Sequence, residues 1–92
     1  MKSEAQLSRE ADLFLARQFG HASVREPDSQ RVRADFNRVF KNDSEALRQY
    51  EIGVVEEDQR RLALGMTTSQ YHLYQSKKTN HQAAKRSSHG SI

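Results

Sequence analysis

The chain has 92 residues, a formal net charge of +3 and no cysteine, and 35% of its residues are apolar. A chain of this length buries about 60–65% of the surface that it exposes when unfolded, so we expect one thin core and no deep, enclosed pocket. The lack of cysteine excludes disulfides, thiolate metal sites and a cysteine nucleophile. No run approaches the roughly 20 apolar residues needed to span a bilayer, so we expect a soluble protein.

Charge is distributed unevenly along the chain. All 12 acidic residues lie at or before Asp58. From Gln59 onward the chain carries no acidic residue and six basic ones: Arg60, Arg61, Lys77, Lys78, Lys85 and Arg86. A basic tail behind an acidic body is typical of a protein that contacts an anionic partner, and it also serves solubility alone.

The first predicted helix covers residues 3–19. Ser3 followed by Gln6 fits a capping box, and Gly20 is suited to the left-handed conformation that closes a helix. His21 then falls in the connector to the next helix. The apolar residues recur at three- and four-residue spacing and are expected to form the buried stripe: Leu7, Ala11, Phe14, Leu15 and Phe19.

The second predicted helix covers residues 29–41 and starts at a cap offered by Asp28 and Ser29. Its expected core residues share one helical face: Val32, Phe36, Val39 and Phe40.

The third predicted helix covers residues 44–64, after an Asn42-to-Glu45 capping pattern, and Gly65 is its expected stop. Gly53 indicates a bend or a close backbone contact. The run Glu56-Glu57-Asp58 is expected to be a solvated face, with Glu56–Arg60 and Glu57–Arg61 pairs. The expected buried stripe is Leu47, Tyr50, Val54, Val55 and Leu62, with Ile52 beside it.

Residues 67–74 predict one more short helix, capped by Thr67 and Gln70. From Gln75 onward the sequence is polar and basic, which predicts disorder unless a partner orders it. We therefore predict an all-α protein, an antiparallel three-helix bundle with a short fourth helix, in which residues 1–74 form the domain and residues 75–92 a flexible basic tail.

The sequence offers no constellation for catalysis or metal binding. The four histidines lie apart, and none pairs with another at the four-residue spacing of helical metal ligands. No glycine-rich phosphate loop or nucleophile elbow is present. We therefore expect no enzyme, no catalytic residues, no metal site and no cofactor, but a protein that binds a partner.

The residues around the second helix resemble the LYR (complex 1 LYR-like) family of small mitochondrial proteins. Leu15-Ala16-Arg17 stands where the family has its Leu-Tyr-Arg triplet, with Ala16 in place of the tyrosine, and Phe36 follows Arg17 by nineteen positions. The run from Arg31 to Phe36 looks most like the succinate dehydrogenase assembly factors of that family. The resemblance covers residues 7–64.

This resemblance implies a non-catalytic adaptor in the mitochondrial matrix, an accessory subunit or assembly factor of a respiratory-chain complex. Its implied partners are a respiratory subunit and an acyl carrier protein, whose acyl chain the family's bundle encloses. The residues expected to face the partner are Arg17, Arg31, Arg33, Arg60 and Arg61. The residues expected to line an acyl chain or the core are Leu15, Phe36, Val39, Phe40 and Val54.

Two alternatives remain open from the sequence. One is a basic helical partner-binding protein of a phage or bacterial system, a chaperone or structural component, which would be cytoplasmic. The other is a nucleic-acid binder, since Arg31, Arg33, Arg38 and Lys41 allow contacts with phosphates. No recognised motif for reading bases accompanies these residues. The N-terminus lacks the apolar core of a secretory signal and the acid-poor composition of a cleaved mitochondrial presequence.

Overall fold

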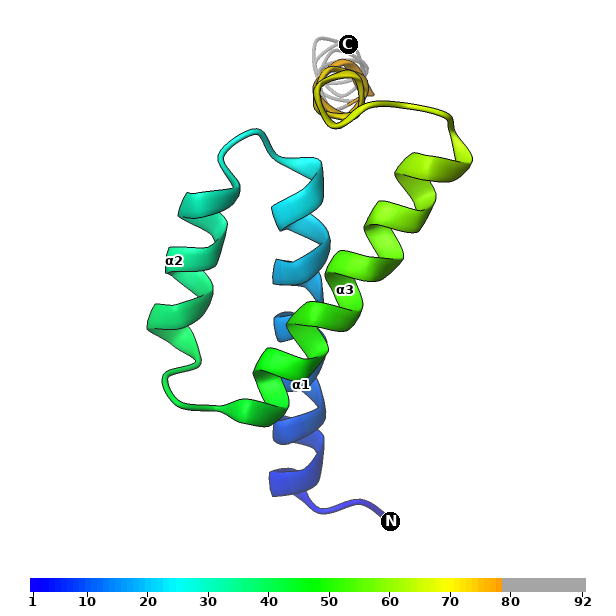
Figure 1. The fold of residues 1–92 in the computed structure, drawn as a ribbon. Helices are drawn as coiled ribbons and strands as arrows, with labels where there is room; N and C mark the ends of the chain where they lie inside the picture. The colour runs from blue at the N-terminus through cyan, green and yellow to red at the C-terminus, as the bar shows by residue number, and fades with distance from the viewer. Residues whose placement is uncertain (79–92) are drawn as a thin grey trace, which may run out of the picture.

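The computed structural model describes residues 1–78, and this part of the chain is helical without a strand. Three helices succeed one another, α1 (Glu4–Arg25), α2 (Ser29–Val39) and α3 (Ser44–Ala63), and a further helical segment covers 68–78 (Figure 1). The all-α prediction is therefore confirmed. The helical segment extends beyond its predicted end at residue 74, and the rest of the predicted tail, 79–92, lies outside the described residues.

The predicted helix starts are confirmed. The Ser3 hydroxyl accepts the Gln6 N–H at 3.2 Å, and the Gln6 side chain accepts the Ser3 N–H at 3.1 Å. Asp28 and Asp43 cap α2 and α3, and Thr67 forms a second reciprocal box with Gln70. Each cap satisfies backbone donors that the first helical turn leaves free, so these signals act within a few residues.

The predicted end of the first helix is wrong, because α1 continues through Gly20 to Arg25. At its crossing with α3, Gly20 faces the backbone of Tyr50 and Val54, while Gly53 faces that of Arg17 and His21. A Cβ atom on Gly20 would lie 2.0 Å from the Tyr50 carbonyl oxygen. The glycine therefore permits two helix backbones to touch and does not terminate a helix.

This close crossing selects which face of α1 is buried. Ala16 and Gly20 are buried, with Leu13 packed beside them, because only small side chains fit between backbones in contact. Of the predicted stripe, Phe19 packs against the core. The prediction is wrong for the other four residues, which are exposed: Leu7, Ala11, Phe14 and Leu15.

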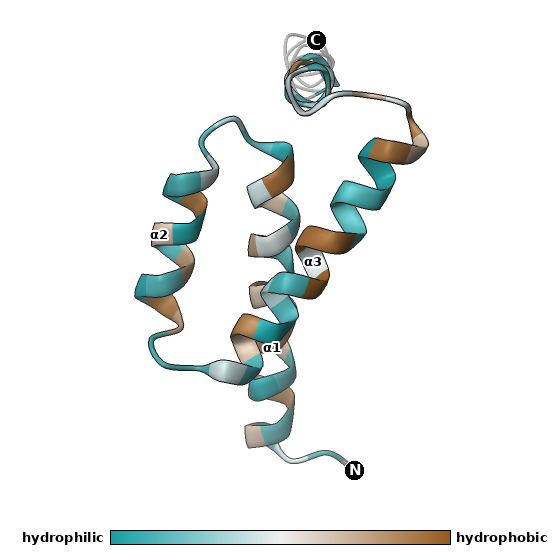
Figure 2. Cartoon of the chain, viewed as in Figure 1, coloured by the Kyte–Doolittle hydropathy of each residue, from teal (hydrophilic) through white to brown (hydrophobic). Residues whose placement is uncertain are grey.

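The same correction applies to α3. Its buried residues are Ala46, Tyr50, Gly53 and Glu57, and Leu47 and Val54 are partly buried against the core. Figure 2 shows brown, apolar segments along α3 and at its C-terminal end, and Val55 and Leu62 are among the residues that remain exposed. The close contact predicted at Gly53 is confirmed.

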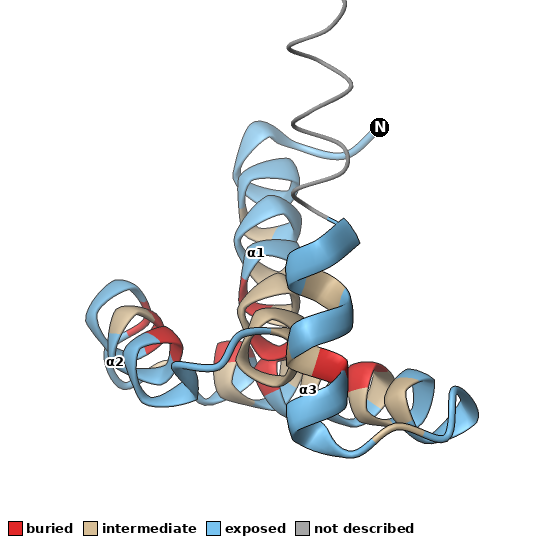
Figure 3. Cartoon of the chain, turned by 90° about the horizontal axis from the view of Figure 1, so that it is seen from above, coloured by how far each residue is buried: buried red, intermediate tan, exposed pale blue. Residues whose placement is uncertain are grey.

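An aromatic cluster joins the three helices. Phe36 of α2 and Phe40, the C-cap residue that follows the helix, are buried, as predicted, while Val39 is exposed. The Phe36 ring centroid lies 6.0 Å from that of Phe19 on α1 and 4.6 Å from that of Tyr50 on α3. Figure 3 shows buried and intermediate residues gathered where the helices meet. Aromatic side chains therefore connect α2 to both neighbours.

The three helices do not contact one another equally. α1 packs extensively against α3 and to a lesser extent against α2, whereas the backbones of α2 and α3 approach each other only sparsely. Figure 1 shows α2 beside α1 and α3 crossing α1 obliquely. A closed antiparallel three-helix bundle stays a prediction, and the contact between α2 and α3 is made by side chains such as Phe36 and Tyr50.

Candidate functional site

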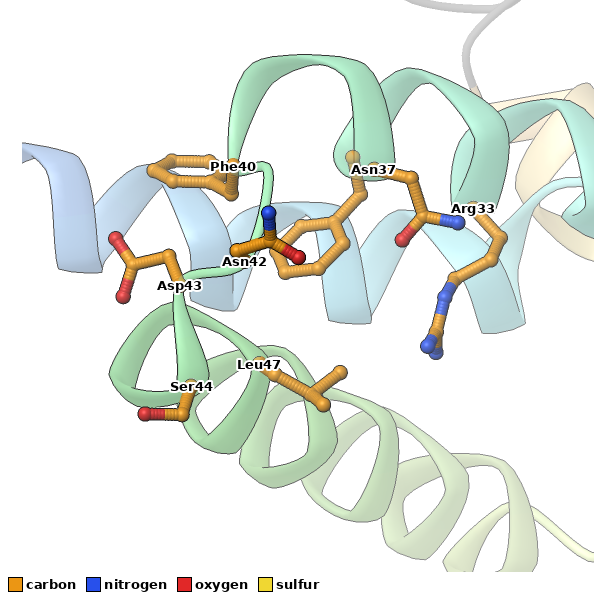
Figure 4. A pocket seen from close by; sticks show the side chains of 8 residues that line it. Arg33, Asn37, Phe40, Asn42, Asp43, Ser44 and Leu47 are labelled. Carbon is orange, nitrogen blue, oxygen red and sulfur yellow. The ribbon is translucent and has the colours of Figure 1, made fainter.

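A groove of about 400 Å³ opens between α2 and the start of α3. Figure 4 shows Arg33 and Asn37 extending from α2, Leu47 from α3 and Asn42 from the connecting turn around the same space. The full lining is Arg33, Phe36, Asn37, Phe40, Asn42, Asp43, Ser44 and Leu47. The groove therefore combines an aromatic wall with amide, hydroxyl and charged groups.

A second hollow of about 490 Å³ adjoins α2 on the side of the α1 C-terminus, and Arg33 and Asn37 line both spaces. Tyr50 and Val54 contribute the α3 wall of the second hollow. Arg33 stands between the two, with its guanidinium carbon 5.0 Å from the Tyr50 ring centroid and 5.9 Å from that of Phe36. This cation–π contact holds the positive charge over the apolar wall.

The turn between α2 and α3 forms part of the groove wall, through Asn42, Asp43 and Ser44. Asn42 adopts a left-handed conformation with a φ of 53°, which asparagine tolerates better than most residues. Asp43 then caps α3 and accepts two hydrogen bonds from Arg9 of α1, at 2.7 and 2.9 Å. The Arg9 guanidinium, aided by the Ala46 N–H, lowers the pKa of Asp43 to about 2.

The structure brings together part of the predicted apolar lining. Phe36 and Phe40 line the groove, and Val54 lines the adjoining hollow. Leu15 and Val39 are exposed and line neither space. The prediction for these two residues is wrong. On α1 the face that packs inward contains Ala16, and on α2 it contains Phe36.

Among the arginines predicted to face a partner, Arg33 alone lines the groove. Arg31 is exposed on the first turn of α2. Arg17 donates two hydrogen bonds to Glu56. Arg61 donates to Asp58 at 2.9 Å and to the Met66 carbonyl oxygen at 2.7 Å. Arg60 approaches Glu57.

These ion pairs replace the expected Glu56–Arg60 and Glu57–Arg61 pairs within α3. Arg17 belongs to α1 and Glu56, 39 positions later, to α3, so their bond connects the two helices. The pair at Glu57 and Arg60 has three-residue spacing, with an N–O distance of 3.9 Å.

Glu57 was expected in a solvated run, and that prediction is wrong, since only 1% of the residue is exposed. Its carboxylate accepts hydrogen bonds from the Tyr71 hydroxyl and from His21 Nδ1, the latter at 2.9 Å, and Arg25 Nε lies 3.7 Å away. Burial alone would raise the pKa of Glu57, but the bonds from Tyr71 and His21 and the nearby arginine charges outweigh it, so the pKa is lowered.

This buried carboxylate connects the helical segment 68–78 to the rest of the fold. Tyr71 is fully buried, and its burial together with the Glu57 charge raises the pKa of the phenol to about 12. His72 Nε2 donates to the Val24 carbonyl oxygen at 3.1 Å. The sequence held a signal for the burial of Glu57, because Tyr50, Gly53 and Glu57 have the spacing of residues that share one helical face.

Comparison with known proteins yields no match: no family model, no curated protein and no solved structure is similar to this chain. Within residues 1–78, no group of three or more His, Asp or Glu side chains is arranged to hold a metal ion. None of the helices in that range combines the length and the apolar character needed to cross a membrane.

Proposed function

We propose that this chain is a non-catalytic adaptor of the LYR type, an accessory subunit or assembly factor of a respiratory-chain complex in the mitochondrial matrix. It binds a protein partner and an acylated carrier protein, and its three main helices act as an antiparallel bundle that closes around the acyl chain. The supporting observation is the groove between α2 and α3, which has Phe36 and Phe40 on its wall and Arg33 at its side.

The two parts of this groove suit the two parts of an acylated carrier. The aromatic wall is apolar enough to cover an alkyl chain, and the removal of that chain from water is the main source of affinity. Arg33 provides a fixed positive charge for the acidic surface or phosphate of the carrier. The backbones of α2 and α3 approach each other only sparsely, so the acyl chain can lie along the groove beside the Phe36–Tyr50 contact without displacing backbone.

A binding titration of the full chain with an acyl carrier protein tests this proposal. The carrier is supplied with and without a fatty acyl group on its prosthetic arm, and isothermal titration calorimetry measures both affinities. We expect the acylated form to bind more tightly by about tenfold or more, because only this form places an alkyl chain in the groove. Equal affinity for both forms, or no binding, contradicts the proposal.

Two arginines of α2 provide matched variants for the same titration. Arg33→Glu reverses the charge at the groove, and we expect it to weaken binding of the acylated carrier by about tenfold or more. Arg38→Glu makes the same change on the exposed face, where Arg38 bonds only locally to Asp35 at 2.7 Å, and is expected to stay within about twofold of the unaltered chain. Equal losses in both variants would indicate general charge attraction.

Affinity purification followed by mass spectrometry distinguishes the proposed function from the alternatives. A respiratory-complex subunit or an acylated carrier among the captured proteins supports the adaptor. Capture of nucleic acid that is released between low and moderate salt supports a nucleic-acid binder, because contacts with phosphates weaken steeply as salt rises.

A further inference from the structure

The second hollow beside α2 is polar and positively charged, unlike the aromatic wall of the groove. Residues of all three helices line it, and Arg33 is the charged residue of this lining. The other polar groups are amides and hydroxyls, and no carboxylate faces the hollow. The full lining is Ser23, Ser29, Gln30, Arg33, Ala34, Asn37, Tyr50 and Val54. An anionic group therefore meets no like charge there.

Three donor-bearing side chains of α2 point to the kind of anion. Gln30, Arg33 and Asn37 have the i, i+3, i+7 spacing of one helical face. Within residues 1–78, none of these side chains forms a hydrogen bond or an ion pair with another residue. The contacts of Arg33 with the rings of Tyr50 and Phe36 fix its guanidinium in place but use none of its N–H groups in a bond to oxygen.

This set of donors suits a phosphate. A guanidinium offers several N–H groups in a fixed fork that matches phosphate oxygens, and each side-chain amide adds two more donors. The amide oxygens of Gln30 and Asn37 also accept hydrogen bonds, so the same face pairs with N–H groups of a ligand. A ligand that carries a phosphate and amide groups would thus satisfy both kinds of group.

We propose that the second hollow binds the phosphate-bearing, amide-containing arm by which a carrier protein holds its acyl chain. The phosphate lies beside Gln30 and Arg33, the amides of the arm pass Asn37, and the alkyl chain continues onto the wall formed by Phe36 and Phe40. One extended ligand can occupy both spaces, because Arg33 and Asn37 line the groove as well as the hollow. This inference rests on the proposed function, and it adds that the chain recognises the arm itself.

The inference is tested with two thioesters that lack the carrier protein, decanoyl phosphopantetheine and decanoyl pantetheine. They differ only in the phosphate, and isothermal titration calorimetry of the full chain measures both affinities, with inorganic phosphate as a third ligand. We expect the phosphorylated thioester to bind more tightly than the other by about tenfold, because hydrogen bonds to a charged group are the stronger ones. Inorganic phosphate alone should bind far more weakly, since it covers no apolar surface.

Two arginines of α2 again provide matched variants. Arg33→Gln should reduce the preference for the phosphorylated thioester to about twofold or less, because the charge that selects it is gone. Arg38→Gln removes an arginine that lines neither space, and its preference should stay within about twofold of that of the unaltered chain. Circular dichroism checks that both variants remain helical.

The carrier titration separates failure of the inference from failure of the proposed function. If the acylated carrier binds as proposed while the two thioesters bind equally, the inference is overturned and the proposed function stands. If neither carrier form binds, the proposed function fails, whereas tighter binding of the phosphorylated thioester still supports the phosphate site. Failure of both thioesters to bind, phosphate alone binding as tightly as its thioester, or equal effects of Arg33→Gln and Arg38→Gln also overturns the inference.

Discussion

At the scale of single residues, Gly20 and Gly53 matter because they have no side chain, not because of an unusual backbone conformation. Both lie inside helices, where glycine is ordinarily less favourable than alanine by about 1 kcal/mol. The compensation is the direct approach of α1 and α3, since each glycine faces backbone atoms of the opposite helix. Gly65 is different, because it has a φ of 67° and open space around its Cα.

We therefore expect Gly20→Ala to destabilise the fold by at least about 2 kcal/mol, because the added methyl group must force two backbones apart. Helix propensity alone predicts the opposite sign. Gly65→Ala should cost only about 1 kcal/mol, through its left-handed conformation. Urea unfolding of the two variants and the unaltered chain measures this order. A Gly20→Ala variant as stable as the unaltered chain would contradict the close crossing.

At the scale of elements, the helical segment 68–78 is held by one buried aromatic side chain and by polar contacts. Tyr71 is its buried residue, and the phenol donates to the buried carboxylate of Glu57. Leu73 and Tyr74 remain exposed to a large extent. The protonated Tyr71 phenol is therefore one of the contacts that dock this segment, beside the bond from His72 to the Val24 carbonyl oxygen.

Alkaline pH should weaken this docking. Because the folded-state pKa of Tyr71 is raised from 10.0 to about 12, its contribution to stability is complete below pH 10 and is lost as the pH rises towards 12. The unfolding free energy of the unaltered chain should thus fall more steeply between pH 10 and 12 than that of Tyr71→Phe. Urea unfolding across this range gives both slopes, and parallel slopes would show that Tyr71 does not titrate with folding.

Tyr71→Phe should also destabilise the chain at neutral pH, by about 1–3 kcal/mol, because Glu57 loses one hydrogen bond while it stays buried. Tyr74→Phe is the control, since Tyr74 is partly exposed and stacks on Tyr71 without a bond to Glu57.

At the scale of the whole molecule, Phe36 is the residue that holds α2 against both other helices. Its ring contacts those of Phe19, Phe40 and Tyr50 and is nearly fully buried. Since α2 and α3 otherwise contact each other sparsely, the position of α2, and with it the shape of the groove, depends on this cluster.

Phe36→Ala should reduce the free energy of unfolding by about 3–5 kcal/mol, through lost burial and the cavity left behind. Val39→Ala, one turn away and exposed, should change it by less than about 1 kcal/mol. Thermal and urea unfolding of both variants tests this contrast. Similar stability losses in the two would mean that α2 presents another face to the core.

Within residues 1–78, the amino-acid sequence alone determined which segments are helical and where each helix starts. The caps at Ser3, Asp28, Asp43 and Thr67 are formed as predicted, because a capping side chain bonds to backbone only three residues away. It also determined the inward position of Phe36 and Phe40.

Only the tertiary structure decided which faces of α1 and α3 are buried. On α1 the more apolar stripe was predicted to face inward, yet Leu7 and Phe14 are exposed and Ala16 and Gly20 are buried. Helical periodicity shows which residues share an apolar face but not which face another helix covers. Where α1 crosses α3 the two backbones touch, so the smallest residues are the ones buried there. The burial of Glu57 likewise depends on tertiary contacts. Its hydrogen-bond partners are His21, 36 positions before it, and Tyr71, 14 positions after it. Contacts at such separations exist only once the helices have packed.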